Sequence, residues 1–231
     1  LVPTVSSIVI SSATGIQNNV LNAGDVVSVT STFSESVPVT GTPQLPIIIG
    51  GNNRTATYTS GSGSTMLVFK YTIQAEETDT DGISIGANTI ALNSGTIKDA
   101  AGNNATLTHN AVSANSSYKV DTTAPTVSSV AMTSATGIQN NLLNAGDVAS
   151  VTATFSENVP VTGTPQLALV VGSTDRTATY HSGSGGTTLV FKYTIQAVET
   201  DDDGISIGAN VLALNSGTIQ DPAGNNATLT H

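Results

Sequence analysis

Polar and apolar residues alternate along much of the chain. Over residues 67–73 the odd positions carry Leu, Phe, Tyr and Ile, whereas the even positions include Lys70 and Thr72. Val29 and Phe33 show a similar spacing. A period of two places the apolar side chains on one face, as in a strand that buries one side in a core. The pattern therefore predicts a sheet with one buried face.

Segments rich in Val, Ile, Thr and Tyr are separated by turns rich in Gly, Asn, Ser and Pro, and no segment has the period of an amphipathic helix. About seven or eight strands in roughly 110–120 residues is typical of an immunoglobulin-like β-sandwich. The expected fold class is therefore all-β. We expect strands near residues 4–12, 26–35, 44–50, 54–59, 65–75, 83–92, 104–109 and 115–120.

The whole pattern occurs twice, at an offset of about 122 residues. The segment 67–75 recurs unchanged at 189–197, and roughly three-quarters of the aligned positions are identical. We therefore expect two tandem immunoglobulin-like domains, at residues 1–121 and 122–231. They are joined end to end by a short, stiff link, because Pro125 restricts both itself and Ala124.

The second copy has no counterpart of residues 110–120, so it is expected to lack its last strand. Either the sequence is shortened, or the second domain keeps an open edge that accepts a strand from another chain. Unpaired edges are usually avoided in proteins.

Charge and composition exclude several classes of function. Of the 231 residues only six are Lys or Arg, scattered singly, and the formal net charge is −10. A nucleic-acid partner is not expected, because phosphate binding needs clustered basic residues. There is no cysteine, which excludes disulfides, thiolate metal sites and cysteine nucleophiles. No apolar run is long enough for direct membrane insertion, and the first residues lack the basic start of a signal peptide.

Acidic residues concentrate in one turn of each copy, which we call the acid turn (residues 77–82 and 199–204). The first reads "ETDTDG" and the second "ETDDDG". If strands alternate in direction, Asp25, the acid turn and Asp121 lie at the end of the domain where the chain leaves. The end where the chain enters carries Glu35, Asp99 and Asn103 in the first copy and Glu157, Asp221 and Asn225 in the second.

Calcium is the expected cofactor of these acids. The chain has few cations to neutralise them, and Ca²⁺ takes six to eight oxygen ligands from carboxylates, amides and carbonyls in irregular loops. The acid turn does not match an EF-hand loop. The alternative is a solvated polar turn. The candidate metal ligands are Asp25, Glu35, Glu77, Asp79, Asp81, Asp99, Asn103, Asp121, Glu157, Glu199, Asp201, Asp203, Asp221 and Asn225.

The segments "VDTTAPTV", "TFSE" and "DAAGN", together with the acid turn, resemble the Ig-like tandem repeats of giant bacterial surface proteins and adhesins. The resemblance implies an extracellular location, on a bacterial cell surface or secreted. It also implies a stalk stiffened by calcium at the domain joints, as in cadherins. By this resemblance Asp121 is the linker ligand, and Glu157 and Asp221 receive the ion. The first copy begins "LVP" where the family has "TAP", so its own entry joint is incomplete.

No enzymatic activity is expected. His109, His181 and His231 lack partners at catalytic or metal-ligating spacing. The expected partners are neighbouring copies of the same repeat. Two other functions remain open: a glycan- or protein-binding module that uses loops such as 46–53 and 168–175, and a strand-exchanging subunit of an extracellular filament.

Overall fold

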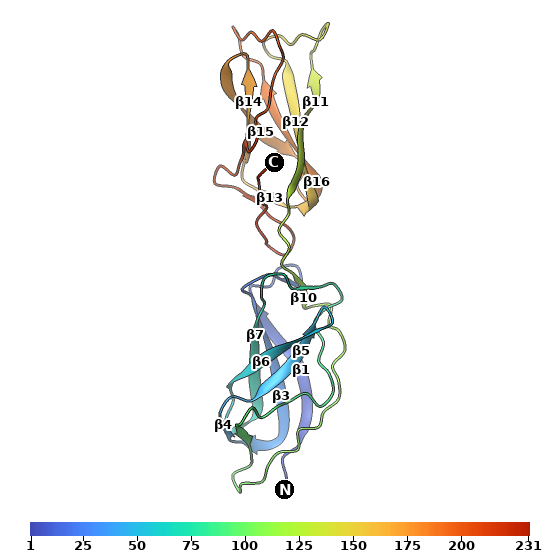
Figure 1. Cartoon of the computed structure of the whole chain (residues 1–231), viewed down its shortest axis with the longest axis vertical. Helices are drawn as coiled ribbons and strands as arrows, with labels where there is room; N and C mark the ends of the chain where they lie inside the picture. The colour runs from blue at the N-terminus through green and yellow to red at the C-terminus, as the bar shows by residue number, and fades with distance from the viewer. The chain divides into compact units, whose positions relative to one another are not determined.

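The computed structural model describes residues 1–231, which form strands, turns and extended segments but no helix (Figure 1). None of its elements is a helix that could cross a membrane. Contacts divide the chain into two compact units, Leu1–Thr123 and Ala124–His231. This division falls just after the boundary expected from the sequence, and each unit is described by itself.

The first unit is built on a sheet of five antiparallel strands in the order β1-β3-β7-β6-β5. Its alternating residues bury one face, as the pattern over residues 67–73 predicts: Leu67 and Phe69 are fully buried, whereas Lys70 is exposed. The strands are β1 (Val5–Thr14), β2 (Val20–Leu21), β3 (Val26–Val37), β4 (Val39–Thr40), β5 (Gln44–Ile49), β6 (Asn52–Ser60), β7 (Ser64–Thr72), β8 (Thr78–Asp79), β9 (Thr96–Ile97) and β10 (Lys119–Asp121).

A second layer of extended chain covers the buried face of this sheet and contributes apolar side chains to the same core, including Ile83, Ile85 and Ile97. It contains two short sheets, β4-β9 and β2-β10-β8. The arrangement is consistent with a β-sandwich. Figure 1 shows β10 at one end of the unit and the N-terminus at the other.

The prediction of strands at residues 83–92 and 104–109 of the first unit is wrong. These segments make only isolated bridges, such as Ile48 with Ser84 and Thr4 with Thr106. Asn88 interrupts the first of these segments with a positive φ of 57°, and Asn93 and Ser94 follow it with φ values of 47° and 62°. A left-handed residue turns the chain, so it cannot continue a strand. The other six expected strands are present, with shifted ends; the last is confined to Lys119–Asp121.

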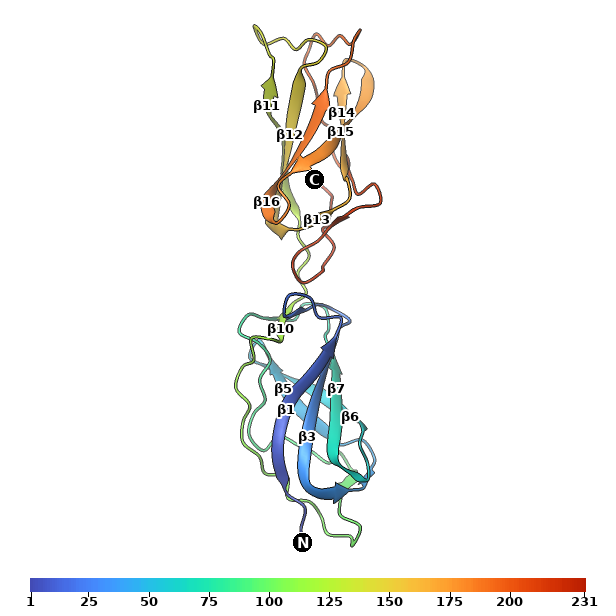
Figure 2. The same ribbon diagram turned by 180° about the vertical axis from the view of Figure 1, so that it is seen from behind.

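The second unit repeats this plan, with a sheet in the order β11-β12-β16-β15-β14-β17 and a small pair β13-β18 (Figure 2). Phe191, Leu189 and Val151 are fully buried at its centre. The strands are β11 (Val127–Thr136), β12 (Val148–Val159), β13 (Val161–Thr162), β14 (Gln166–Val171), β15 (Thr174–Ser182), β16 (Gly186–Thr194), β17 (Leu212–Ala213) and β18 (Thr218–Ile219).

Ser31 is the one clear mismatch inside the first core. It is 0% exposed, and its hydroxyl oxygen has no hydrogen-bond partner. The second unit has Ala153, also 0% exposed, at the corresponding place. We expect Ser31→Ala to raise the free energy of unfolding of the first unit by about 1 kcal/mol, because an unpaired buried hydroxyl is removed. Ala153→Ser should lower that of the second unit by a similar amount. Denaturant unfolding measures both, and a destabilising Ser31→Ala would contradict this assignment.

Candidate functional site

Glu77, the first residue of the acid turn, is buried in a network of hydrogen bonds. The Arg54 guanidinium forms an ion pair with Glu77 Oε1, and the Tyr71 hydroxyl donates to the same oxygen at 2.7 Å. The Gln74 backbone N–H donates to Oε2 at 2.9 Å. The Glu77 side chain is only 3% exposed. Arg54 is therefore a basic partner of Glu77 that the charge pattern of the sequence did not reveal.

Asp79 is also buried, and its two oxygens bind different parts of the backbone. Oδ2 accepts from the Gly50 N–H at 2.8 Å, and Oδ1 accepts from the Gly82 N–H at 2.8 Å. These bonds connect the β5–β6 hairpin to the acid turn. Asp81 is exposed. Glu77 and Asp79 thus stabilise the fold through buried hydrogen bonds, and only Asp81 faces solvent.

The second acid turn repeats the network around the glutamate of the first. Arg176 pairs with Glu199, and the Tyr193 hydroxyl donates to Glu199 Oε1 at 2.6 Å. Gln196 N–H donates to Oε2 at 2.7 Å, and the Gly204 N–H donates to Asp201 Oδ1 at 2.8 Å. Asp203 is exposed, like Asp81.

Burial and the hydrogen bonds around Glu77 and Glu199 shift pKa values in both networks. Burial and the hydrogen bond to Glu77 raise the pKa of Tyr71 to about 12. Burial also acts to raise the pKa of Glu199, but hydrogen bonds from Tyr193, the Gln196 backbone and Arg176 outweigh it, and the net pKa is lowered. The carboxylate is therefore held in its charged form.

Asp25 has a local structural role. Its Oδ2 accepts from the Asn22 N–H at 2.8 Å, and its backbone carbonyl accepts from the Ile73 N–H at 2.8 Å. A Cβ at Gly15 would lie 1.7 Å from Asp25 Oδ1, and Gly15 has a φ of 89°, so glycine is required there. Asp147 makes the same contact to Asn144 in the second unit, at 2.6 Å.

The opposite end of each unit carries an Asp–Asn turn. Asp99 accepts from the backbone and side-chain nitrogens of Asn103 at 2.8 and 2.6 Å. The Asn103 hydrogen bonds lower the pKa of Asp99. Asp221 and Asn225 repeat this turn at 2.9 and 2.7 Å. Each Asn side chain thus uses its nitrogen to hold the Asp, which leaves only its Oδ1 to face an ion.

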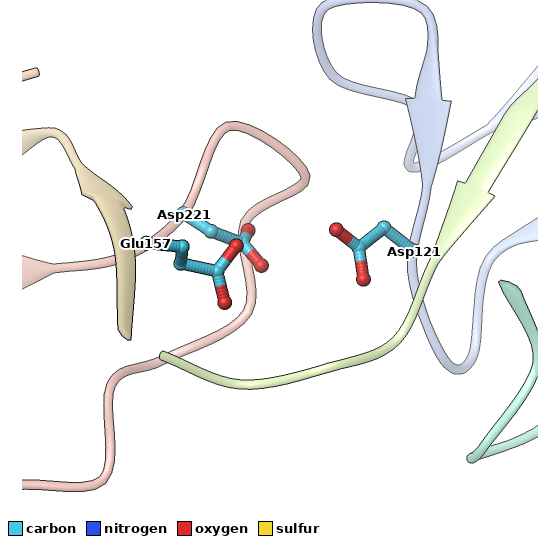
Figure 3. Close-up of side chains that lie close together, drawn as sticks. All are labelled: Asp121, Glu157 and Asp221. Carbon is cyan, nitrogen blue, oxygen red and sulfur yellow. The ribbon is translucent and has the colours of Figure 1, made fainter. Parts of the chain in front are cut away.

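In the second unit this turn lies beside a further carboxylate. A carboxylate oxygen of Glu157, near the end of β12, lies within 4.8 Å of one of Asp221 (Figure 3). Asp221 is buried and Glu157 is half-buried. Glu35 is the counterpart of Glu157 in the first unit and is also half-buried. Two carboxylates so close repel each other unless a cation or a proton lies between them.

Within the first unit, the candidate residues gather at the two ends as the alternating strands imply. Asp25 adjoins the end of β7, and Asp79 pairs with Val120 in β10. Asp121 ends β10, and its Oδ1 accepts from the Thr123 N–H at 3.0 Å. At the other end, the Thr106 N–H donates to the Pro3 carbonyl, which brings residues 99–106 to the start of the chain.

Sequence reasoning missed the partners of the acid turn, which are Arg54 and Tyr71 in the first unit and Arg176 and Tyr193 in the second. A signal was available, because both the basic and the aromatic residue recur at the same distance before the turn in each copy. No family model matches the chain, and no curated protein matches it.

Proposed function

We propose that the chain is a structural extender, built from two tandem immunoglobulin-like β-sandwich domains, in the stalk of a bacterial cell-surface or secreted repeat protein. The observation that carries this proposal is that the same ion pair of a buried glutamate recurs in both units, as Glu77 with Arg54 and as Glu199 with Arg176. The duplicated residues are those that hold each fold together. This is what an array of spacer domains needs.

We further propose that calcium binds at the end of the second unit that carries Glu157 and Asp221. The donors fit the ion, since two carboxylates within 4.8 Å and the Asn225 amide oxygen are hard oxygen ligands. Calcium would neutralise the pair and so stabilise this end. The resemblance to bacterial surface repeats adds Asp121 as a linker ligand, and that part of the proposal rests on the sequence alone.

The test is thermal unfolding of the chain in EDTA and in millimolar Ca²⁺, with Mg²⁺ as the control ion. At a dissociation constant ten- to a hundredfold below the calcium concentration, binding should stabilise the chain by roughly 1.5–3 kcal/mol. Glu157→Gln should remove the calcium-dependent rise in midpoint. The matched control is Asp202→Asn, which removes an exposed acid and should leave the rise intact.

The acid turn offers a poorer variant for this experiment. Asp79→Asn would disturb the bonds to Gly50 and Gly82 with or without an ion, so a lower midpoint would not report on calcium. An equal response to Ca²⁺ in Glu157→Gln and in the unchanged chain would contradict this calcium site. A chain that shows no response to Ca²⁺ at all would contradict calcium as the stiffener.

A further inference from the structure

The first unit has a groove between β1 and the extended segment 108–112, which runs beside it (Figure 2). We call it the edge groove. Its volume is about 550 Å³, within the range of about 300–1,000 Å³ that is typical of ligand sites. One wall is the outer strand of the five-stranded sheet, and the other is a segment whose Val112 packs against the core.

Strand β1 and this segment begin as neighbours and then separate. Thr4 and Thr106 form a parallel bridge, and the Thr106 N–H donates to the Pro3 carbonyl at 2.8 Å. No further bridge joins the two segments beyond this point. The register of β1 shifts between Val5 and Ser7, as at a β-bulge, and a bulge bends its strand. The groove lies where the two segments have separated.

The backbone of the segment 108–112 directs unpaired groups into the groove. In an extended chain, the backbone groups of successive residues point to opposite edges. Thr106 points toward β1. The His109 N–H donates to Asn88 Oδ1 at 2.8 Å and its carbonyl accepts from the Asn88 N–H at 3.2 Å, both on the other side. Thr108 and Asn110 flank His109, so their N–H groups point toward β1, and neither makes a hydrogen bond.

Strand β1 presents backbone groups from the opposite wall. It is the edge of the sheet, because β3 is its only partner strand. Thr4 faces β3, since its carbonyl accepts from the Ser34 N–H at 2.9 Å, so Pro3 and Val5 face away from β3. An edge strand exposes a row of unpaired N–H and C=O groups. The groove thus has main-chain donors and acceptors on both walls.

The side chains along the groove determine which ligand it fits. They include Ile8, Ala111 and Val112 and the small polar residues Ser7 and Thr108, but no Lys, Arg, Asp or Glu. Ile8 is buried and Val112 is half-buried. The whole chain has a formal net charge of −10, which disfavours an acidic peptide and a second copy of the chain. A neutral peptide with apolar side chains at alternate positions fits this lining.

We propose that the edge groove is a β-strand acceptor, and that its ligand is an uncharged, extended peptide segment of another protein. The segment lies between β1 and residues 108–112 and pairs with both. Its main chain bonds to Val5 on one side and to Thr108 and Asn110 on the other, and every second side chain contacts Ile8 and Val112. Main-chain bonds supply affinity and the alternate side chains supply selectivity, as in other strand-addition complexes.

The experiment titrates a blocked peptide of four Thr-Val pairs, with a lysine at each end for solubility, into the full chain. NMR follows the backbone amides. We expect one peptide per chain, with shifted signals and slower exchange for the amides of Val5, Thr108 and Asn110. The same peptide methylated at two backbone nitrogens should bind at least about tenfold more weakly, because it loses two main-chain donors.

Ala111→Trp is the variant that fills the groove, and Ala114→Trp is its matched control. Both alanines are exposed, but only Ala111 lines the groove. Ala111→Trp should therefore abolish binding, whereas Ala114→Trp should leave the affinity unchanged. Unchanged amide signals in β3 and β7 verify that both variants fold.

Four results would overturn the proposal: no binding at millimolar peptide, equal binding of the plain and the methylated peptide, unchanged binding by Ala111→Trp, or self-association of the chain that protects the Thr108 amide without peptide. The last would make a second copy the ligand. The titration is run in EDTA, so its outcome is independent of the calcium site.

Discussion

Glu77→Gln is expected to lower the free energy of unfolding of the first unit by about 2 kcal/mol. The substitution removes a buried negative charge and leaves the Arg54 guanidinium without its ion-pair partner. Breaking a fully buried pair costs about 3–5 kcal/mol, and we expect less here because the Arg54 side chain is 36% exposed. Native-state hydrogen exchange measures the effect, since it reports on each unit separately.

Glu76→Gln is the matched control for this variant. It removes the same charge from the neighbouring residue, which is exposed, and should change the stability by less than about 0.5 kcal/mol. Glu199→Gln should reproduce the loss in the second unit. Equal effects of Glu76→Gln and Glu77→Gln would mean that the network around Glu77 adds no stability.

Val120→Asp is expected to have a larger effect, lowering the stability of the first unit by more than about 3 kcal/mol. It removes a buried apolar side chain, worth roughly 1.5–3 kcal/mol, and places a carboxylate opposite buried Asp79. With β10 displaced, the Leu21 and Ile83 amides should exchange faster than they do in the unchanged chain.

Lys119→Gln is the control on the same strand. Lys119 is partly exposed, and its backbone bonds do not depend on its side chain, so its stability change should stay within about 0.5 kcal/mol. If Val120→Asp leaves the exchange of Leu21 unchanged, β10 does not close this end of the first unit.

The strands that the sequence predicted well are those whose burial alternates on one open sheet. Leu67 and Phe69 reveal β7 directly, because Lys70 and Thr72 lie on the solvent side. Residues 83–92 could not be assigned in the same way. Ile83 and Ile85 are buried like strand residues, but the positive φ of Asn88 depends on a local turn that an alternating pattern does not register.

The sequence was enough to predict at which end of the unit the candidate residues lie, but it did not reveal what these residues do. The alternation of strand directions was enough to bring Asp25 and Asp79 to one end of the first unit and Asp99 to the other. The role of Glu77 depends on Arg54, which a different strand supplies. Such a pairing follows from the packing of strands that are distant in sequence, so a count of charges in one turn cannot reveal it.

The position of β10 in the chain also decides when the first unit can finish folding. Its partner β2 lies roughly 100 residues earlier, so this pairing has one of the longest loops of the unit to close. During synthesis, all strands of the five-stranded sheet, residues 5–72, are made before β10. At that stage the sheet β2-β10-β8 still lacks its central strand. The growing chain therefore passes through a stage in which Leu21 is uncovered, and only the emergence of residues 119–121 ends it.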